Sequence, residues 1–138
     1  MTTQEMADRI LDLIAKHGDT TFPEIINSIG DEARGNIAFE LSPNTILWDG
    51  ISQTLFDSFA LIKDKLELHK THFLIPAFDG ALLDLPIARS APKKGYKRPH
   101  WLPIVFRFRN KQDADERRAL LRQRLSTAHH LHDADDEA

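Results

Sequence analysis

Residues 52–75 read S-Q-T-L-F-D-S-F-A-L-I-K-D-K-L-E-L-H-K-T-H-F-L-I, and they carry the pattern of a central core helix. Together with the residue before them, they place five apolar side chains on one arc of a helical wheel: Ile51, Leu55, Phe59, Ile62 and Leu66. The pattern predicts a helix that begins with Asp49 as its N-cap. Residues 66–69 favour a short strand that leads out of this helix.

Two further helices are expected before this stretch. Thr2 and Glu5 have the spacing of a capping box, and the helical apolar pattern that follows ends at Gly18. The same spacing of Thr21 and Glu24 opens a second, shorter helix. The sequence therefore predicts three helices in the first half of the chain.

A β-hairpin is expected after the third helix. Residues 73–78 and 81–87 are rich in apolar side chains, and they flank Asp79 and Gly80, a dipeptide that favours a tight turn. By contrast, residues 31–46 combine turn-forming residues with scattered apolar ones, which predicts an irregular or weakly helical segment.

This order of elements resembles that of a winged-helix domain over residues 3–88, with 52–75 similar to the third helix running into the wing. In DNA-binding members of that family, the third helix enters the major groove. Here Gln53, Asp57 and Asp64 gather on the arc opposite the apolar one, and their carboxylates would repel phosphate. The resemblance therefore implies the fold, whereas the third helix is not expected to contact DNA bases. Many winged helices are implied to bind protein instead.

The expected fold class is α+β: three N-terminal helices, a small antiparallel sheet and a C-terminal helix. A length of 138 residues and a hydrophobic content of 41% suit one core. We therefore expect a single winged-helix-like domain over residues 1–110, containing a basic loop at 89–101 and a strand at 102–109. Residues 111–138 would add a helix and a flexible acidic tail.

The C-terminal helix is expected over residues 114–131, with Asp113 and Glu116 at capping spacing. Arg117 and Arg124 fall on the same arc as the leucines, so complete burial of that face would also bury two guanidinium groups. A partly exposed helix with extended arginine side chains is expected. It could enlarge a basic surface, provide a dimer contact or simply be a solvated charged helix.

Charge is distributed very unevenly along the chain. The segment 89–111 contains eight cationic side chains and no acid. The eight are Arg89, Lys93, Lys94, Lys97, Arg98, Arg107, Arg109 and Lys111. This segment carries +8 and the rest of the chain −11, which together give the formal net charge of −3. Such a cationic segment is typical of a surface that binds a polyanion, although it could also be a solvated surface.

Aromatic residues lie between these cations, and flat rings can stack on nucleic-acid bases. Residues 92–101 contain prolines and glycine and should form an exposed loop, whereas 102–109 alternate as a strand does, with Phe106 directed to the core. Trp101 could either stack on a base or anchor the loop. The candidate binding residues are Lys93, Lys94, Tyr96, Lys97, Arg98, His100, Trp101, Arg107 and Arg109.

Two functions fit these features. The first is a non-catalytic protein that binds DNA or RNA through the basic segment, mainly by phosphate contacts. The second is a protein-interaction module, a regulator, adaptor or inhibitor. It would dock on an acidic protein surface, on a ribonucleoprotein or on a second copy of the chain, through the basic loop or the acidic face of the third helix.

Several other classes of function find no support in the sequence. The chain has no cysteine, which excludes disulfides, thiolate zinc sites and cysteine nucleophiles. No nucleophile elbow or phosphate-binding glycine loop occurs, so no enzyme activity or cofactor is expected. His69 and His72, and the histidines near the C-terminus, lack the spacing of a rigid metal site. A polar N-terminus, and no apolar run near the roughly 20 residues of a membrane span, favour a cytoplasmic protein.

Overall fold

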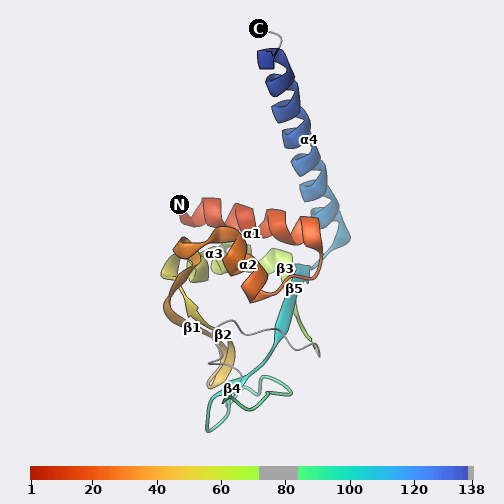
Figure 1. The fold of residues 1–138 in the computed structure, drawn as a ribbon. Coiled ribbons are helices and arrows are strands. Elements are labelled where there is room, and N and C mark those ends of the chain that lie inside the picture. Colours follow the sequence, from red (N-terminus) through yellow and green to blue (C-terminus); the bar gives the residue numbers. More distant parts are fainter. Residues whose placement is uncertain (72–83, 137–138) are drawn as a thin grey trace.

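The computed structural model describes residues 1–71 and 84–136, and its fold is α+β, as expected (Figure 1). The helices are α1 (Thr3–His17), α2 (Phe22–Ile29), α3 (Gln53–Ile62) and α4 (Lys111–Asp136). The strands are β1 (Arg34–Ser42), β2 (Thr45–Ile51), β3 (Leu66–Lys70), β4 (His100–Trp101) and β5 (Ile104–Phe108). Two 3-10 turns, η1 (Asp31–Ala33) and η2 (Lys63–Lys65), precede β1 and β3.

The first two helices begin and end as their sequences predict. The Thr2 hydroxyl accepts the Glu5 backbone N–H at 3.1 Å. At the start of α2, the Thr21 hydroxyl accepts the Glu24 N–H at 3.3 Å, and the Glu24 carboxylate accepts the Thr21 N–H at 3.2 Å. Because the caps satisfy N–H groups that no helical carbonyl can reach, they fix where each helix starts.

The expectation of an irregular segment at residues 31–46 is wrong. After η1, this part of the chain forms β1 and the beginning of β2, joined by a turn at Pro43 and Asn44. The register between the two strands shifts at several points along the pair. Such bulges interrupt the two-residue alternation by which a strand is recognised in a sequence.

The expected start of the third helix is also wrong. Asp49 lies in β2, and the N-cap of α3 is Ser52, whose hydroxyl accepts the Leu55 N–H at 3.1 Å. Of the five apolar residues assigned to one helical arc, Ile51 belongs to β2 and Leu66 to β3. Both are buried, so the apolar pattern identified core positions correctly but merged three elements into one.

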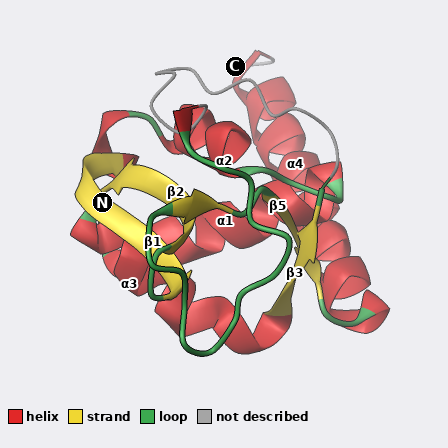
Figure 2. Ribbon diagram, turned by 90° about the horizontal axis from the view of Figure 1, so that it is seen from below, coloured by secondary structure: helices red, strands yellow, loops and turns green. Residues whose placement is uncertain are grey.

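The strands form two small sheets that lie side by side, with helices behind them (Figure 2). One sheet has the order β1-β2-β4, in which β1 and β2 are antiparallel and β2 and β4 parallel. The other pairs β3 with β5 antiparallel, and it confirms the short strand expected at 66–69. The predicted strand 73–78 and its turn lie outside the described residues. Of the strand predicted at 81–87, Ile87 forms an isolated bridge to Trp101.

The core is aromatic at its centre. The Phe106 ring stacks on Phe59 with centroids 4.8 Å apart, and it meets the edge of Phe22 at 4.9 Å. These three side chains come from β5, α3 and α2, so one cluster joins elements that are distant in the sequence. Phe106 is 2% exposed, which confirms the apolar face predicted for the strand 102–109.

The last helix differs from its prediction at both ends. It begins at Lys111, where the Asn110 side-chain oxygen accepts the Asp113 N–H at 2.8 Å, so Asp113 is not its N-cap. The helix continues to Asp136, beyond the expected end near residue 131. Its first part packs on α1, and the remainder projects from the body (Figure 1).

Candidate nucleic-acid interface

The candidate interface is built on residues 89–101, the basic loop. Its last two residues form β4, and it lies at the end of the molecule opposite α4 (Figure 1). The neighbouring element is the turn that connects β1 to β2, at Pro43 and Asn44. The loop is therefore carried by the hairpin that the sequence did not predict.

Backbone hydrogen bonds fix the basic loop to this turn. The Tyr96 N–H donates to the Pro43 carbonyl at 3.0 Å, and the His100 N–H donates to the Asn44 carbonyl at 2.8 Å. The Asn44 side-chain amide in turn donates to the Tyr96 carbonyl at 2.8 Å. Three bonds between two segments hold the loop in one position, which lowers the entropy lost when it binds a ligand.

Gly95 allows the close contact between the basic loop and the turn. Its φ angle is +73°, a conformation that L side chains rarely adopt. A Cβ at this position would lie 2.1 Å from the carbonyl oxygen of Pro43. Glycine is therefore required here both by the backbone angle and by the available space.

Besides Arg89 at its start, four cations of the basic loop face solvent. Lys93, Lys94, Lys97 and Arg98 are all exposed. Among the described residues, none of the four takes part in an ion pair. We call these residues the loop cations. Because no carboxylate neutralises them within the described part of the chain, they create a local positive potential that favours an anion.

Tyr96 and His100 stack on each other within the loop, with ring centroids 3.9 Å apart and an interplanar angle of 16°. The Tyr96 hydroxyl donates to the Ser90 carbonyl at 2.9 Å, and Nδ1 of His100 lies 2.8 Å from the Arg98 carbonyl oxygen. Both residues are partly buried. The two rings therefore brace the loop, and only part of each ring surface is accessible to a partner.

Trp101 is a core residue and leaves the set of candidate contacts. It is 1% exposed, its ring meets Trp48 at 6.2 Å, and its indole N–H donates to the Leu47 carbonyl at 3.3 Å. Of the two roles considered for this side chain, anchoring is the one that the structure shows. Burial of so large a side chain fixes the C-terminal end of the basic loop to the β-sheet.

Of the two arginines expected to extend the basic surface, Arg107 is neutralised by an acid and Arg109 is not. Arg107 forms an ion pair with Asp19 at 2.9 Å, which neutralises its charge locally. Arg109 is exposed, but its guanidinium donates to the Leu66 carbonyl at 3.2 Å. The charge of Arg107 is thus neutralised within the fold, whereas Arg109 keeps an exposed charge whose position is fixed by its bond to the Leu66 carbonyl.

The acidic arc of the third helix is only partly a helical feature. Gln53 and Asp57 are exposed on α3, where the Gln53 amide donates to the Asp57 carboxylate at 2.8 Å. Asp64 is exposed but belongs to η2. The carboxylates remain at the surface, so this face still offers negative charge to a partner.

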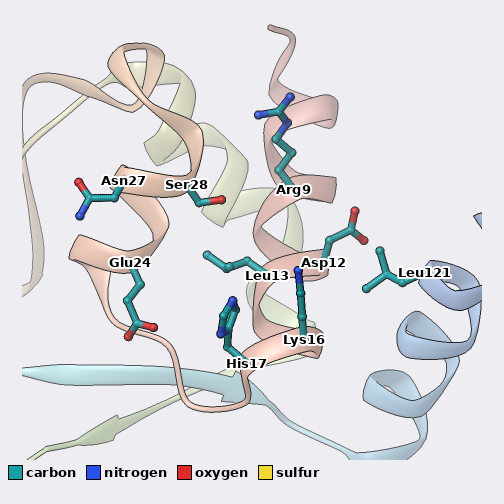
Figure 3. A pocket seen from close by; sticks show the side chains of 9 residues that line it. All are labelled: Arg9, Asp12, Leu13, Lys16, His17, Glu24, Asn27, Ser28 and Leu121. Atoms are coloured by element: carbon teal, nitrogen blue, oxygen red, sulfur yellow. The ribbon is translucent and has the colours of Figure 1, made fainter. Parts of the chain in front are cut away.

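Apart from the basic loop, the structure has a hollow of about 720 Å³ between α1, α2 and α4 (Figure 3). Two of its polar side chains are used by the fold: Asp12 accepts from Arg117 and Arg124 at 3.1 Å each, and Glu24 caps α2. Figure 3 shows the remaining polar groups spread around the rim.

Metal binding finds no support in the described residues, where no group of three or more histidine or acidic side chains could hold an ion. His69 instead lies 3.0 Å from the Glu67 carboxylate, and His72 is outside the described residues. Of the helices in the described ranges, none has the length and apolar composition needed to cross a bilayer.

Comparisons with protein-family models, with curated proteins and with solved structures find no match to this chain. The winged-helix resemblance therefore stays a prediction, and the wing itself would fall largely within residues 72–83, which are not described. A function is therefore inferred from the position and the charges of the basic loop.

Proposed function

We propose that this protein binds nucleic acid without catalysing a reaction, and that the loop cations make the principal contacts. One observation carries the proposal: Lys93, Lys94, Lys97 and Arg98 are exposed, and they have no ion-pair partner among the described residues. Phosphates along a strand would supply the missing negative charges, and their counterions would be released on binding.

The position of the loop supports this proposal. Its three hydrogen bonds to the β1–β2 turn keep the four cations together before any ligand arrives. Three of the four are lysines, which bind phosphate as point charges and read little sequence. We therefore expect weak sequence preference, with DNA and RNA both accepted. A cytoplasmic location belongs to the same proposal, since RNA is accessible there.

Charge reversal tests the proposal. The loop variant combines Lys93→Glu, Lys94→Glu, Lys97→Glu and Arg98→Glu. Its matched control reverses four exposed cations elsewhere: Lys16, Lys63, Lys65 and Arg122. The two variants have the same net charge, so a difference between them reports the location of the charge and not its total. Circular dichroism would check that both variants are folded.

Binding of short labelled single-stranded and double-stranded oligonucleotides would be followed by fluorescence anisotropy. The loop variant should lose at least about a hundredfold in affinity, whereas the control should stay within about threefold of the parent protein. Equal losses in both variants, or no binding by the parent protein in low salt, would contradict the proposal.

A second candidate is docking of the basic loop on an acidic protein surface. The rigid attachment of the loop to the turn favours it, because a fixed shape suits a complementary protein surface. An affinity pull-down with the parent protein, with and without nuclease treatment, separates the two candidates. Partners that survive nuclease but are lost with the loop variant would favour the protein surface.

A further inference from the structure

A second surface, to which the basic loop contributes no residue, is apolar. A groove of about 410 Å³ lies between α3, β1 and the β3–β5 sheet, and we call it the α3 groove. Its apolar lining includes Phe39, Leu41, Phe56, Phe59, Leu68 and Phe106. Two of these side chains are substantially open to solvent, Leu41 at 47% and Phe56 at 38%. A groove of this size and composition is within the range that binds ligands in proteins.

Among the described strands, two that border the α3 groove have an edge without a partner strand. In the described part of the chain, β1 pairs with β2 alone, and β3 pairs with β5 alone. Within residues 1–71 and 84–136, no backbone hydrogen bond satisfies the outer edge of β1. On β3, the Leu66 carbonyl accepts from the Arg109 guanidinium at 3.2 Å. Free edges of this kind present N–H and C=O groups that can pair with an added strand.

The rim of the α3 groove carries positive charge. Lys63 and Arg109 line it, both exposed. The acidic side chain in the lining is Glu67, and its carboxylate lies 3.0 Å from His69. The rim therefore favours an occupant with acidic residues beside its apolar ones.

We propose that the α3 groove docks a short extended peptide in which apolar residues alternate with polar ones and acidic residues flank the apolar core. The peptide would pair along the free edge of β1 and place alternate side chains beside Phe39 and Leu41. This geometry follows from the two-residue period of a strand, which turns every second side chain to one face. The inference does not depend on nucleic-acid binding, because the basic loop contributes no residue to this groove.

A peptide fits the α3 groove better than a second copy of the chain does. A stable protein–protein interface buries about 1,200–2,000 Å² in total, and it usually centres on a broad apolar patch. Here the most open apolar members of the groove are Leu41 and Phe56, which are too few to form such a broad patch. The remaining exposed residue of similar size on α3, Leu61, does not line the groove.

The direct test uses a labelled, blocked heptapeptide with Leu, Phe and Leu separated by Thr and with Glu at both ends. Two matched peptides accompany it: one has Lys in place of the terminal Glu residues, and the other has Pro in place of the inner Thr residues. The Glu-ended peptide should bind at least about tenfold more tightly than the Pro peptide, because proline lacks the N–H that pairs with a strand.

Variants of the full chain locate the binding site. Leu41→Glu and Phe56→Glu should each weaken binding of the Glu-ended peptide by about tenfold or more, because a carboxylate would enter the apolar groove. Leu61→Glu is the matched control on the same helix, and it should leave the affinity within about twofold. Lys63→Glu should weaken binding of the Glu-ended peptide and strengthen binding of the Lys-ended one. A general loss of folding would weaken binding of both peptides.

Three outcomes would overturn the inference. The first is no measurable binding of the Glu-ended peptide to the folded parent protein. The second is equal weakening by Leu61→Glu and Leu41→Glu, since the α3 groove would then not be the site. The third is a change from dimer to monomer on Leu41→Glu in analytical ultracentrifugation, which would make a second copy of the chain the occupant.

Discussion

Gly95 and Gly18 have nearly the same φ angle but very different surroundings. Their φ angles are +73° and +79°. A Cβ on Gly18 would have no neighbour within 4 Å, whereas one on Gly95 would collide with Pro43. Comparing the same substitution at the two sites therefore separates the cost of backbone strain from the cost of the close contact.

We predict that Gly18→Ala lowers the free energy of unfolding by about 1–3 kcal/mol, which is the cost of holding alanine in a sparsely populated backbone region. Gly95→Ala should cost about 2–5 kcal/mol, because overpacking against Pro43 is added to the strain of a positive φ angle. Alternatively, the loop could detach locally and give a smaller loss. In that case oligonucleotide affinity should fall for Gly95→Ala but not for Gly18→Ala. Urea denaturation and anisotropy would measure both quantities.

Trp101 provides a second prediction at the level of a single residue. Trp101→Phe keeps an aromatic ring but removes the indole N–H that donates to Leu47, and it leaves space in the core. We expect the free energy of unfolding to fall by about 1–3 kcal/mol. Oligonucleotide affinity of the folded variant should not change, since the parent side chain is buried. A selective loss of affinity with normal stability would instead make Trp101 a contact residue.

At the scale of elements, the sequence correctly predicted the features that depend on residues close to one another in the chain. The caps at Thr2 and Thr21 depend on bonds to residues three positions away, and both were correctly predicted. The start of α3 was not, because Asp49 is as good a capping residue as Ser52 until β2 is known to exist. That strand is defined by its irregular pairing with β1, which no local pattern in the sequence reveals.

The same distinction applies to the candidate interface. Exposure of the loop cations follows from the composition of a loop rich in lysine, proline and glycine, and the sequence predicted it. The composition of the loop did not predict that Trp101 and Arg107 would leave the set of candidate binding residues. Their partners are Leu47, 54 residues away, and Asp19, 88 residues away. Contacts over such separations become visible only when the chain is folded.

The attachment of α4 gives a prediction about a whole element. Arg117 is the least exposed of the arginines that join this helix to α1, with 15% of its side chain accessible, and it pairs with Asp12 at 3.1 Å and Asp8 at 3.7 Å. Arg117→Ala should lower the free energy of unfolding by about 1–3 kcal/mol. It should also speed proteolysis of α4.

Arg122→Ala is the matched control, because it makes the same change on an exposed part of α4 where the structure gives no ion pair in the described residues. Its effect on stability should stay within about 0.5 kcal/mol. Similar losses for the two variants would mean that helix propensity, and not the contact with α1, determines the stability of α4.

The whole molecule keeps its opposite charges apart. The basic loop lies at the end away from α4, and the chain outside residues 89–111 carries a formal charge of −11 (Figure 1). A polyanion that approaches the loop is therefore repelled by the body at long range and attracted at short range. At an ionic strength of 0.15 M the screening length is about 8 Å, so the local attraction should dominate.

Salt dependence tests how many phosphates the whole molecule contacts. If the four loop cations each displace one counterion from a single-stranded oligonucleotide, the logarithm of the binding constant should fall with the logarithm of salt concentration with a slope of about −3. Replacing Lys97 by Gln should reduce the size of this slope by about 0.7, because one phosphate contact is removed. Lys16→Gln, which lies on α1 outside the loop, should leave the slope unchanged. A slope that does not respond to Lys97→Gln would show that the oligonucleotide binds to another surface.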